Sequence, residues 1–196
     1  MQEKKRGRTH SRWLLPAALV LAGAAWFENF TLSTSTVTAA CTALPEAFSG
    51  LRIVQISDLH GRRFDAESRY LLELVRLQSP DLIALTGDLA DEFTDFSMLP
   101  PLLDGLTALA PTFYVTGNHE WVLSREKREA LFSMLDAAGV VRLQNEYRLL
   151  KKGQASIVLA GVDDPNGPYD QKRPAQLVRE ILQSRGRDAY ILMLSH

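Results

Sequence analysis

The sequence predicts an α/β fold in which a mostly parallel β-sheet is covered by helices. From residue 50 onward, apolar segments rich in β-branched residues alternate with segments of helical periodicity, as in strand–helix–strand units. Three apolar segments, residues 51–57, 82–86 and 112–116, are followed at once by Asp, Gly-Asp or Gly-Asn. Because ligands of open α/β sheets sit beyond the carboxyl ends of the strands, these polar residues are expected to converge at one edge.

The remaining elements follow from periodicity and from residues that begin or end helices. Helices are predicted over residues 66–77, 96–109, 124–138 and 173–183, the second with a possible break at Pro100-Pro101. Ser124 is the expected N-cap of the third helix, and Gly139 is its expected stop. Further strands are predicted over residues 140–143, 147–150, 155–160 and 189–195.

The amino-terminal segment predicts a membrane leader. Residues 1–12 carry five basic residues against one acid and are expected to stay cytoplasmic. Residues 13–30 are interpreted either as a transmembrane anchor or as a signal peptide. We favour the anchor, because Trp13 and Trp26 lie at the two edges of the apolar stretch, as in an interfacial aromatic belt.

Both interpretations export the rest of the chain, so the protein is expected at the cell membrane with its folded domain outside the cytoplasm. If the segment is a signal peptide, Ala22-Gly-Ala24 is the candidate cleavage site. Residues 31–49 are rich in Thr, Ser and Ala and predict an extended linker, with room for one edge strand before Leu44-Pro45.

Composition narrows the function classes. The chain is 46% hydrophobic and 23% charged, which is ordinary for a globular domain with a sizeable core. A formal net charge of −1 gives no basic face for nucleic acid, so no nucleic-acid partner is expected. The single cysteine, Cys41, excludes an internal disulfide and a cysteine-based zinc site.

Metal-ligating residue types gather at the predicted strand ends. Each of them alone has a commonplace explanation as a helix cap, a turn residue or a surface polar residue. Their ordered occurrence at four strand ends favours a shared site instead. The residues in question are Asp58, His60, Asp88, Asp91, Asn118, His119 and His196. Oxygen and nitrogen ligands of this kind suit divalent ions such as Mn, Fe, Zn or Mg, without selecting among them.

These motifs, Asp58-x-His60, Gly87-Asp88-x-x-Asp91 and Gly117-Asn-His-Glu120 with a strand-final His196, resemble those of the calcineurin-like metallophosphoesterases. The resemblance is greatest to the membrane-linked bacterial phosphodiesterases and covers about residues 50–196. It implies a four-layer α/β/β/α sandwich.

The family's later Gly-His-x-His motif is absent from this sequence, so the domain over residues 50–196 is expected to be incomplete at its carboxyl terminus. The chain is expected to supply mainly the amino-terminal half of the sandwich. On this interpretation the strand ending at Leu194 would lack a facing sheet.

The resemblance also implies residue roles. Asp88 would bridge two metal ions, with Asp58 and His60 completing the shell of one ion. Asn118 and His196 would contribute to the other ion. His119 would contact the phosphate and protonate the leaving group, with its second nitrogen held by Asp91.

The implied activity is hydrolysis of phosphodiester or pyrophosphate bonds through a metal-bridging hydroxide. The substrate would be a phosphoester small molecule or a lipid, reached at the membrane surface through the amino-terminal anchor. The alternative is a truncated, non-catalytic fragment that binds metal weakly. A weaker candidate at the same rim, the segment from Asp163 to Gly167, is expected to be a plain turn.

Overall fold

The structure is a computed structural model that describes residues 14, 16, 19, 32–65, 67–168 and 171–196. The chain divides into two units, Met1–Val37 and Thr38–His196. The predicted leader and almost all of the predicted anchor lie outside the described residues. Within the described part, no helix combines the length and the apolar character needed to cross a membrane. The expected edge strand is absent from residues 32–49, whose only regular element is a short 3-10 helix, η2 (Glu46–Phe48).

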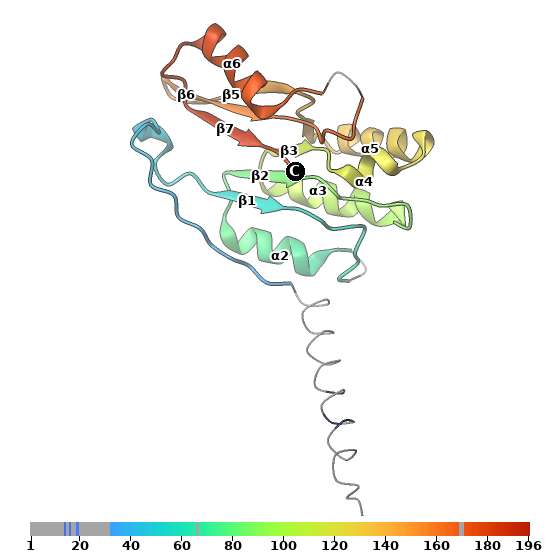
Figure 1. The fold of residues 1–196 in the computed structure, drawn as a ribbon. Helices are drawn as coiled ribbons and strands as arrows, with labels where there is room; N and C mark the ends of the chain where they lie inside the picture. Colours follow the sequence, from blue (N-terminus) through green and yellow to red (C-terminus); the bar gives the residue numbers. More distant parts are fainter. Residues whose placement is uncertain (1–13, 15, 17–18, 20–31, 66, 169–170) are drawn as a thin grey trace, which may run out of the picture. The chain divides into compact units, whose positions relative to one another are not determined.

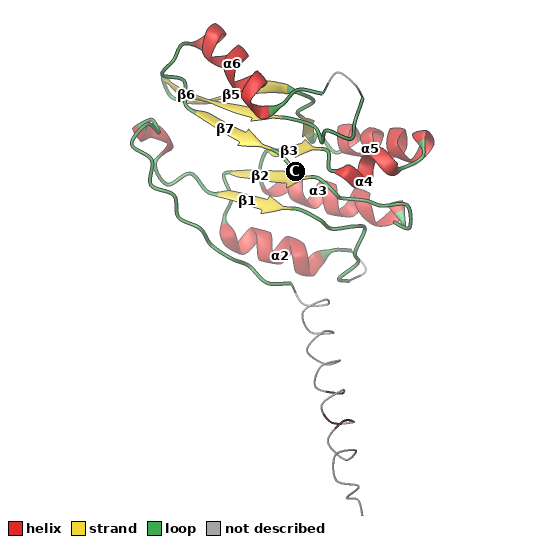
Figure 2. Cartoon of the chain, in the orientation of Figure 1, coloured by secondary structure: helices red, strands yellow, loops and turns green. Residues whose placement is uncertain are grey.

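The first sheet carries the three strands that were predicted to end in polar motifs (Figures 1 and 2). All of its strands are parallel, and their order is β1-β2-β3-β4. Every residue of β2 and β3 is buried, as expected for strands that are covered on both faces. The strands are β1 (Ile53–Ile56), β2 (Leu82–Thr86), β3 (Thr112–Val115) and β4 (Val141–Arg142). The predicted α/β fold with a parallel sheet is therefore confirmed.

Helices α2 (Arg69–Gln78), α3 (Leu99–Leu109) and α5 (Arg125–Ala137) accompany this sheet. Figure 1 shows α2 and α3 on the side of the sheet that faces away from the second sheet. The expected break at Pro100-Pro101 does not occur, because both prolines lie in the first turn of α3. A proline there removes an N–H that has no partner within the helix. A short 3-10 turn, η3 (Phe96–Met98), precedes the helix.

The predicted ends of α5 are confirmed. The Ser124 hydroxyl accepts a hydrogen bond from the Lys127 backbone N–H at 3.3 Å, which is the N-cap interaction. Gly139 has a φ of 78°, the left-handed conformation that commonly follows the end of a helix.

The second sheet contains β5 (Glu146–Lys152), β6 (Ala155–Gly161) and β7 (Ile191–Leu194). β5 and β6 pair antiparallel, whereas β6 and β7 pair parallel. Helix α6 (Pro174–Arg185) covers one face of this sheet by packing Leu177 and Ile181 against residues of β6.

The two sheets face each other across an apolar layer. Leu82 and Phe113 of the first sheet pack in one cluster with Leu159 and Leu194 of the second. The order of layers is therefore helices, sheet, sheet and helix, as Figure 1 shows. The expectation that the strand ending at Leu194 would lack a facing sheet was wrong. This strand joins the β5–β6 hairpin rather than the first sheet, and Leu194 is only 6% exposed.

Candidate metal centre

The turns that follow β1 and β2 lie side by side and continue the backbone pairing beyond the strands. The Asp58 N–H donates to the Gly87 carbonyl at 3.1 Å, and the His60 N–H donates to the Asp88 carbonyl at 2.8 Å. Asp58, His60 and Asp88 have φ values of 56°, 47° and 53°. Such left-handed conformations are uncommon outside glycine and concentrate at functional sites, where surrounding contacts hold them.

Asp88 lies at the centre of the candidate site. Its side chain is shared by two groups of potential metal ligands, in each of which the ligand atoms lie within 4.8 Å of one another. Asp58 and His196 complete one group, and His60 and His119 complete the other. Asp88 is buried, with 3% exposure. One carboxylate thus stands between two places where a cation can be held.

The distances around Asp88 define this arrangement. Its Oδ2 lies 3.4 Å from His196 Nε2 and 3.8 Å from His60 Nε2. Its Oδ1 accepts a hydrogen bond from the His119 backbone N–H at 2.9 Å. The rings of His60 and His119 meet edge to face, with centroids 4.6 Å apart. Two imidazoles and the first turn of helix α4 (Asn118–Val122) are thereby held against the same carboxylate.

His196 is oriented for metal binding. Its Nδ1 lies 2.9 Å from the Thr86 carbonyl oxygen, which can only accept a hydrogen bond. The proton is therefore assigned to Nδ1, and the lone pair of Nε2 points to the Asp88 side, as in metal-ligating histidines held by a backbone carbonyl. Partial burial lowers the pKa of His196, but the Thr86 hydrogen bond and the nearby carboxylates outweigh it, so the pKa is raised overall.

Glu120 is a residue of this site to which the sequence interpretation gave no role. Its side chain is fully buried, with 0% exposure. One oxygen accepts from the Leu89 and Ala90 N–H groups at 2.7 and 3.3 Å. The other accepts from the Asp88 and Gly117 N–H groups at 3.0 and 2.7 Å. A single carboxylate therefore fixes the turn that carries Asp88 to the turn that precedes α4.

A signal for Glu120 exists in the sequence. Glu120 lies three residues after Gly117, which is the spacing of a capping box, and at this spacing a Glu side chain reaches back to the N-cap N–H. The hydrogen bonds to the Asp88 turn depend on tertiary structure and have no local signal.

Two predicted roles are not settled by the geometry. Asp91 Oδ2 lies 3.8 Å from His60 Nδ1, so the contact that the structure shows is to His60. The predicted interaction of Asp91 with the second ring nitrogen of His119 stays a prediction. The ligand role of Asn118, a half-buried residue that begins α4, also stays a prediction.

The assignment of ligands to individual ions stays a prediction. The resemblance placed Asp58 and His60 on the same ion. In the structure, ligand atoms of Asp58, Asp88 and His196 lie within 4.8 Å of one another, and so do those of His60, Asp88 and His119.

A polar link joins the two sheets beside the site. The Thr116 hydroxyl donates to Asp163 Oδ1 at 2.8 Å and accepts from Trp121 Nε1 at 3.0 Å. Burial raises the pKa of Asp163, partly offset by its hydrogen bonds from Thr116. The predicted turn is present, since Asp164 Oδ1 accepts from the Asn166 N–H at 2.8 Å. Asp163 itself is a buried tie between the sheets and not a solvated turn residue.

The donor set fits a divalent cation. It combines carboxylate oxygens with imidazole nitrogens, ligands that Mn, Fe, Zn and Mg sites use in different proportions. The Thr86 hydrogen bond that leaves His196 Nε2 free supports the same conclusion.

Comparison with known proteins agrees with this site. The calcineurin-like phosphoesterase family matches residues 51–196. The uncharacterized metallophosphoesterase YkoQ of Bacillus subtilis (strain 168) is 33% identical over 117 residues, covering 58% of this chain and 43% of YkoQ. Phosphodiesterase YaeI of Escherichia coli (strain K12) is 33% identical over 118 residues, with the same two coverages. The chain thus spans less than half the length of these relatives.

Among solved structures, TT1561 of Thermus thermophilus resembles this chain with a TM-score of 0.50 and 17% identity. The likeness covers 74% of this chain and 68% of TT1561, and at this identity it concerns the fold alone. Since the family match spans the strands, the turns and the histidines of the site, this chain belongs to the calcineurin-like phosphoesterase family.

Proposed function

We propose that this chain carries the metal centre of a phosphoesterase that hydrolyses phosphodiester or pyrophosphate bonds. The observation that carries the proposal is the position of Asp88, which belongs to both groups of potential ligands. When bound, two divalent ions neutralise the phosphate charge and activate the attacking water. The name of the Escherichia coli relative supports a phosphodiester as the first substrate to test.

The protein's own residues divide the remaining work. Asp88 would hold both ions, with Asp58 and His196 completing one set of ligands and His60 contributing to the other. Asn118 adds a neutral oxygen. His119 faces the phosphate and donates a proton to the leaving oxygen, a role typically worth about 10² to 10⁴ in rate. Its backbone N–H donates to Asp88 Oδ1, which holds His119 beside the carboxylate that would bind the ions.

The proposed location is the cell membrane, with residues 13–30 as the anchor, the amino terminus cytoplasmic and the folded domain outside. A lipid or another phosphoester at the membrane surface is then the proposed substrate. A reporter fused after Thr42 should lie outside the cytoplasm, and the protein should stay in the membrane fraction at alkaline pH. A shortened soluble product would show that the segment is cleaved.

The proposed activity is tested with the full chain, purified in mild detergent and supplied with Mn²⁺. The substrate is thymidine 5′-(p-nitrophenyl phosphate), a phosphodiester that releases p-nitrophenol. Asp88→Asn should lower turnover by more than about 100-fold, because loss of a group that only supports a metal ligand already costs about 10- to 100-fold. Asp104→Asn, which removes an exposed carboxylate from α3, is the matched control. Equal turnover in the wild type and Asp88→Asn would refute the proposal.

A further inference from the structure

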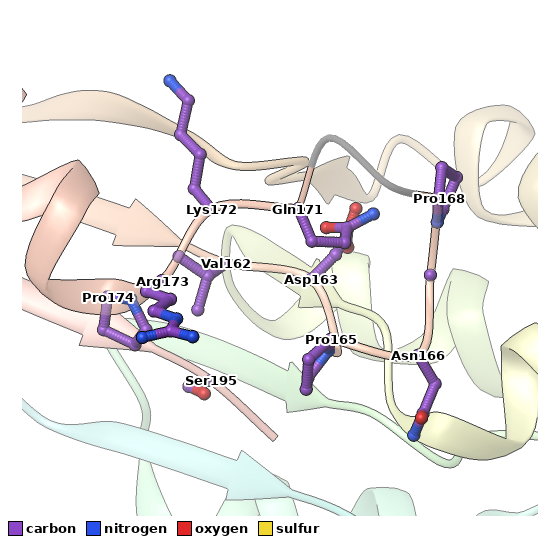
Figure 3. A pocket seen from close by; sticks show the side chains of 11 residues that line it. Val162, Asp163, Pro165, Asn166, Pro168, Gln171, Lys172, Arg173, Pro174 and Ser195 are labelled. Atoms are coloured by element: carbon purple, nitrogen blue, oxygen red, sulfur yellow. The ribbon is translucent and has the colours of Figure 1, made fainter.

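A cavity of about 770 Å³ is formed by loops around the end of the second sheet (Figure 3). The turn of residues 162–168 forms one wall, and residues 171–174 with Ser195 form the other. Ser195 directly precedes His196, whose imidazole belongs to one group of metal ligands. The cavity has the size of a small-molecule site, and Ser195 links it along the chain to the metal centre.

Among the described residues, two basic side chains line this cavity, and they differ in whether they have an ion-pair partner. Lys172 Nζ forms an ion pair with Glu180 at 2.6 Å, and Figure 3 shows its side chain pointing away from the other labelled residues. Within the residues that the structure describes, the Arg173 guanidinium has no hydrogen bond or ion pair. Figure 3 shows this guanidinium on the side of the cavity where Ser195 lies. Of the two basic residues that the structure describes along this cavity, Arg173 is therefore the one available to a ligand.

Among the described lining residues there is one acid, Asp163, which opposes an anionic ligand. Asp163 is 5% exposed, and its Oδ1 is occupied by hydrogen bonds from the Thr116 N–H and hydroxyl at 3.3 and 2.8 Å. One oxygen of this acid is thus engaged by Thr116, and little of the residue is exposed to a ligand. The amino-terminal end of α6, which begins at Pro174, adds a smaller attraction for anions on the same side as Arg173.

We propose that this cavity binds a second phosphate group of the substrate and that Arg173 is its specificity-determining residue. The inference rests on the proposed function, because it places the reacting phosphate at Asp88 and the rest of the substrate in the cavity. A guanidinium presents a planar set of donors that matches two phosphate oxygens at once. The preferred substrates are therefore phosphoesters that carry a further phosphate, and those with a single phosphate are poorer.

The test compares two probes that differ only in the second phosphate, thymidine 3′,5′-bisphosphate and thymidine 5′-monophosphate. Their binding to the full chain with Mn²⁺ is measured by calorimetry, which requires no turnover. Arg173→Ala should weaken the binding of the bisphosphate by about 10- to 100-fold, the usual range for the loss of a hydrogen bond to a charged group. The affinity for the monophosphate should change by less than about twofold in this variant.

Two further variants make the result specific. Arg179→Ala removes the same charge from an exposed position on α6 outside the cavity and should leave both affinities unchanged. Arg173→Lys keeps the charge but loses the planar donors, so it should recover only part of the preference. Thermal melting of each variant shows whether the fold is kept.

The outcomes separate this inference from the proposed function. Equal affinity of the wild type for both probes would overturn the inference. An Arg173→Ala variant that loses affinity equally for both probes would overturn it as well. An Arg179→Ala effect equal to that of Arg173→Ala would also overturn it. Failure to hydrolyse thymidine 5′-(p-nitrophenyl phosphate), with the bisphosphate preference intact, would instead count against the proposed function.

Discussion

Glu120→Gln should destabilise the protein far more than an ordinary loss of charge. The carboxylate is fully buried and accepts four backbone hydrogen bonds, two on each oxygen. The amide of Gln keeps the shape but presents an NH₂ group, which cannot accept, to two of the four N–H donors. Whichever way the amide is turned, two buried N–H groups lose their partner.

The magnitude follows from this count. A buried N–H left without a partner costs about 1–3 kcal/mol, so two cost about 2–6 kcal/mol. We expect a loss of about 3 kcal/mol or more, a large part of the 5–15 kcal/mol that is usual for a domain of about this size. Metal affinity should fall as well, by about 10- to 100-fold, because the turn that carries Asp88 is no longer fixed.

Urea unfolding of the full chain measures the first effect, and Mn²⁺ calorimetry measures the second. Glu129→Gln is the matched control, because Glu129 is exposed and pairs with Arg125 across one helical turn at 2.7 Å. Such exposed pairs contribute at most about 1 kcal/mol. A Glu120→Gln variant as stable as Glu129→Gln would refute the account of Glu120 as the tie between the two turns.

Two other predictions concern His119 and Asp163. His119→Ala should slow hydrolysis by a factor of about 10² to 10⁴ and leave the number of bound metal ions unchanged. The loss of rate should be smaller for substrates with better leaving groups. Loss of one bound metal ion would show that His119 is a ligand instead. Burial raises the pKa of Asp163 in the folded protein above its value in the unfolded chain. The neutral carboxyl therefore contributes its full stability below the unfolded-state pKa. That contribution is lost as the pH rises through the folded-state pKa. Asp163→Asn does not titrate, so its stability relative to the wild type should rise as the pH increases above about 4, the ordinary pKa of an Asp, as urea midpoints would show. A difference that does not change with pH would contradict the burial of this carboxyl.

The strands and helix ends were predictable because their signals are local. The apolar segments over residues 51–57, 82–86 and 112–116 each contain one of the first three strands of the parallel sheet. Ser124 and Gly139 act within a few residues of themselves, so the bounds of α5 followed from residue type. The effect of Pro100 was harder to predict. A proline in the first turn of a helix and a proline that breaks a helix differ only in where the helix begins, which residue type alone does not show.

The arrangement of the second sheet and the details of the site were not predictable in this way. The apolar strand β7 fits either sheet by its sequence, and its parallel pairing with β6 places it in the second, where Leu194 packs against Leu82 and Phe113 of the first. Glu120 and Asp163 bind backbone and side-chain groups that are 30 or more residues away in sequence. Such contacts depend on the completed fold, so residue type and spacing did not reveal them.

The most direct test of the account is whether Asp88 joins two metal ions. Electron paramagnetic resonance of the full chain loaded with two equivalents of Mn²⁺ reports magnetic coupling between ions that share a ligand. The account predicts a coupled signal in the wild type and in the control Asp104→Asn, and loss of the coupling in Asp88→Asn. Uncoupled single-ion spectra in the wild type, or coupling that survives Asp88→Asn, would contradict it.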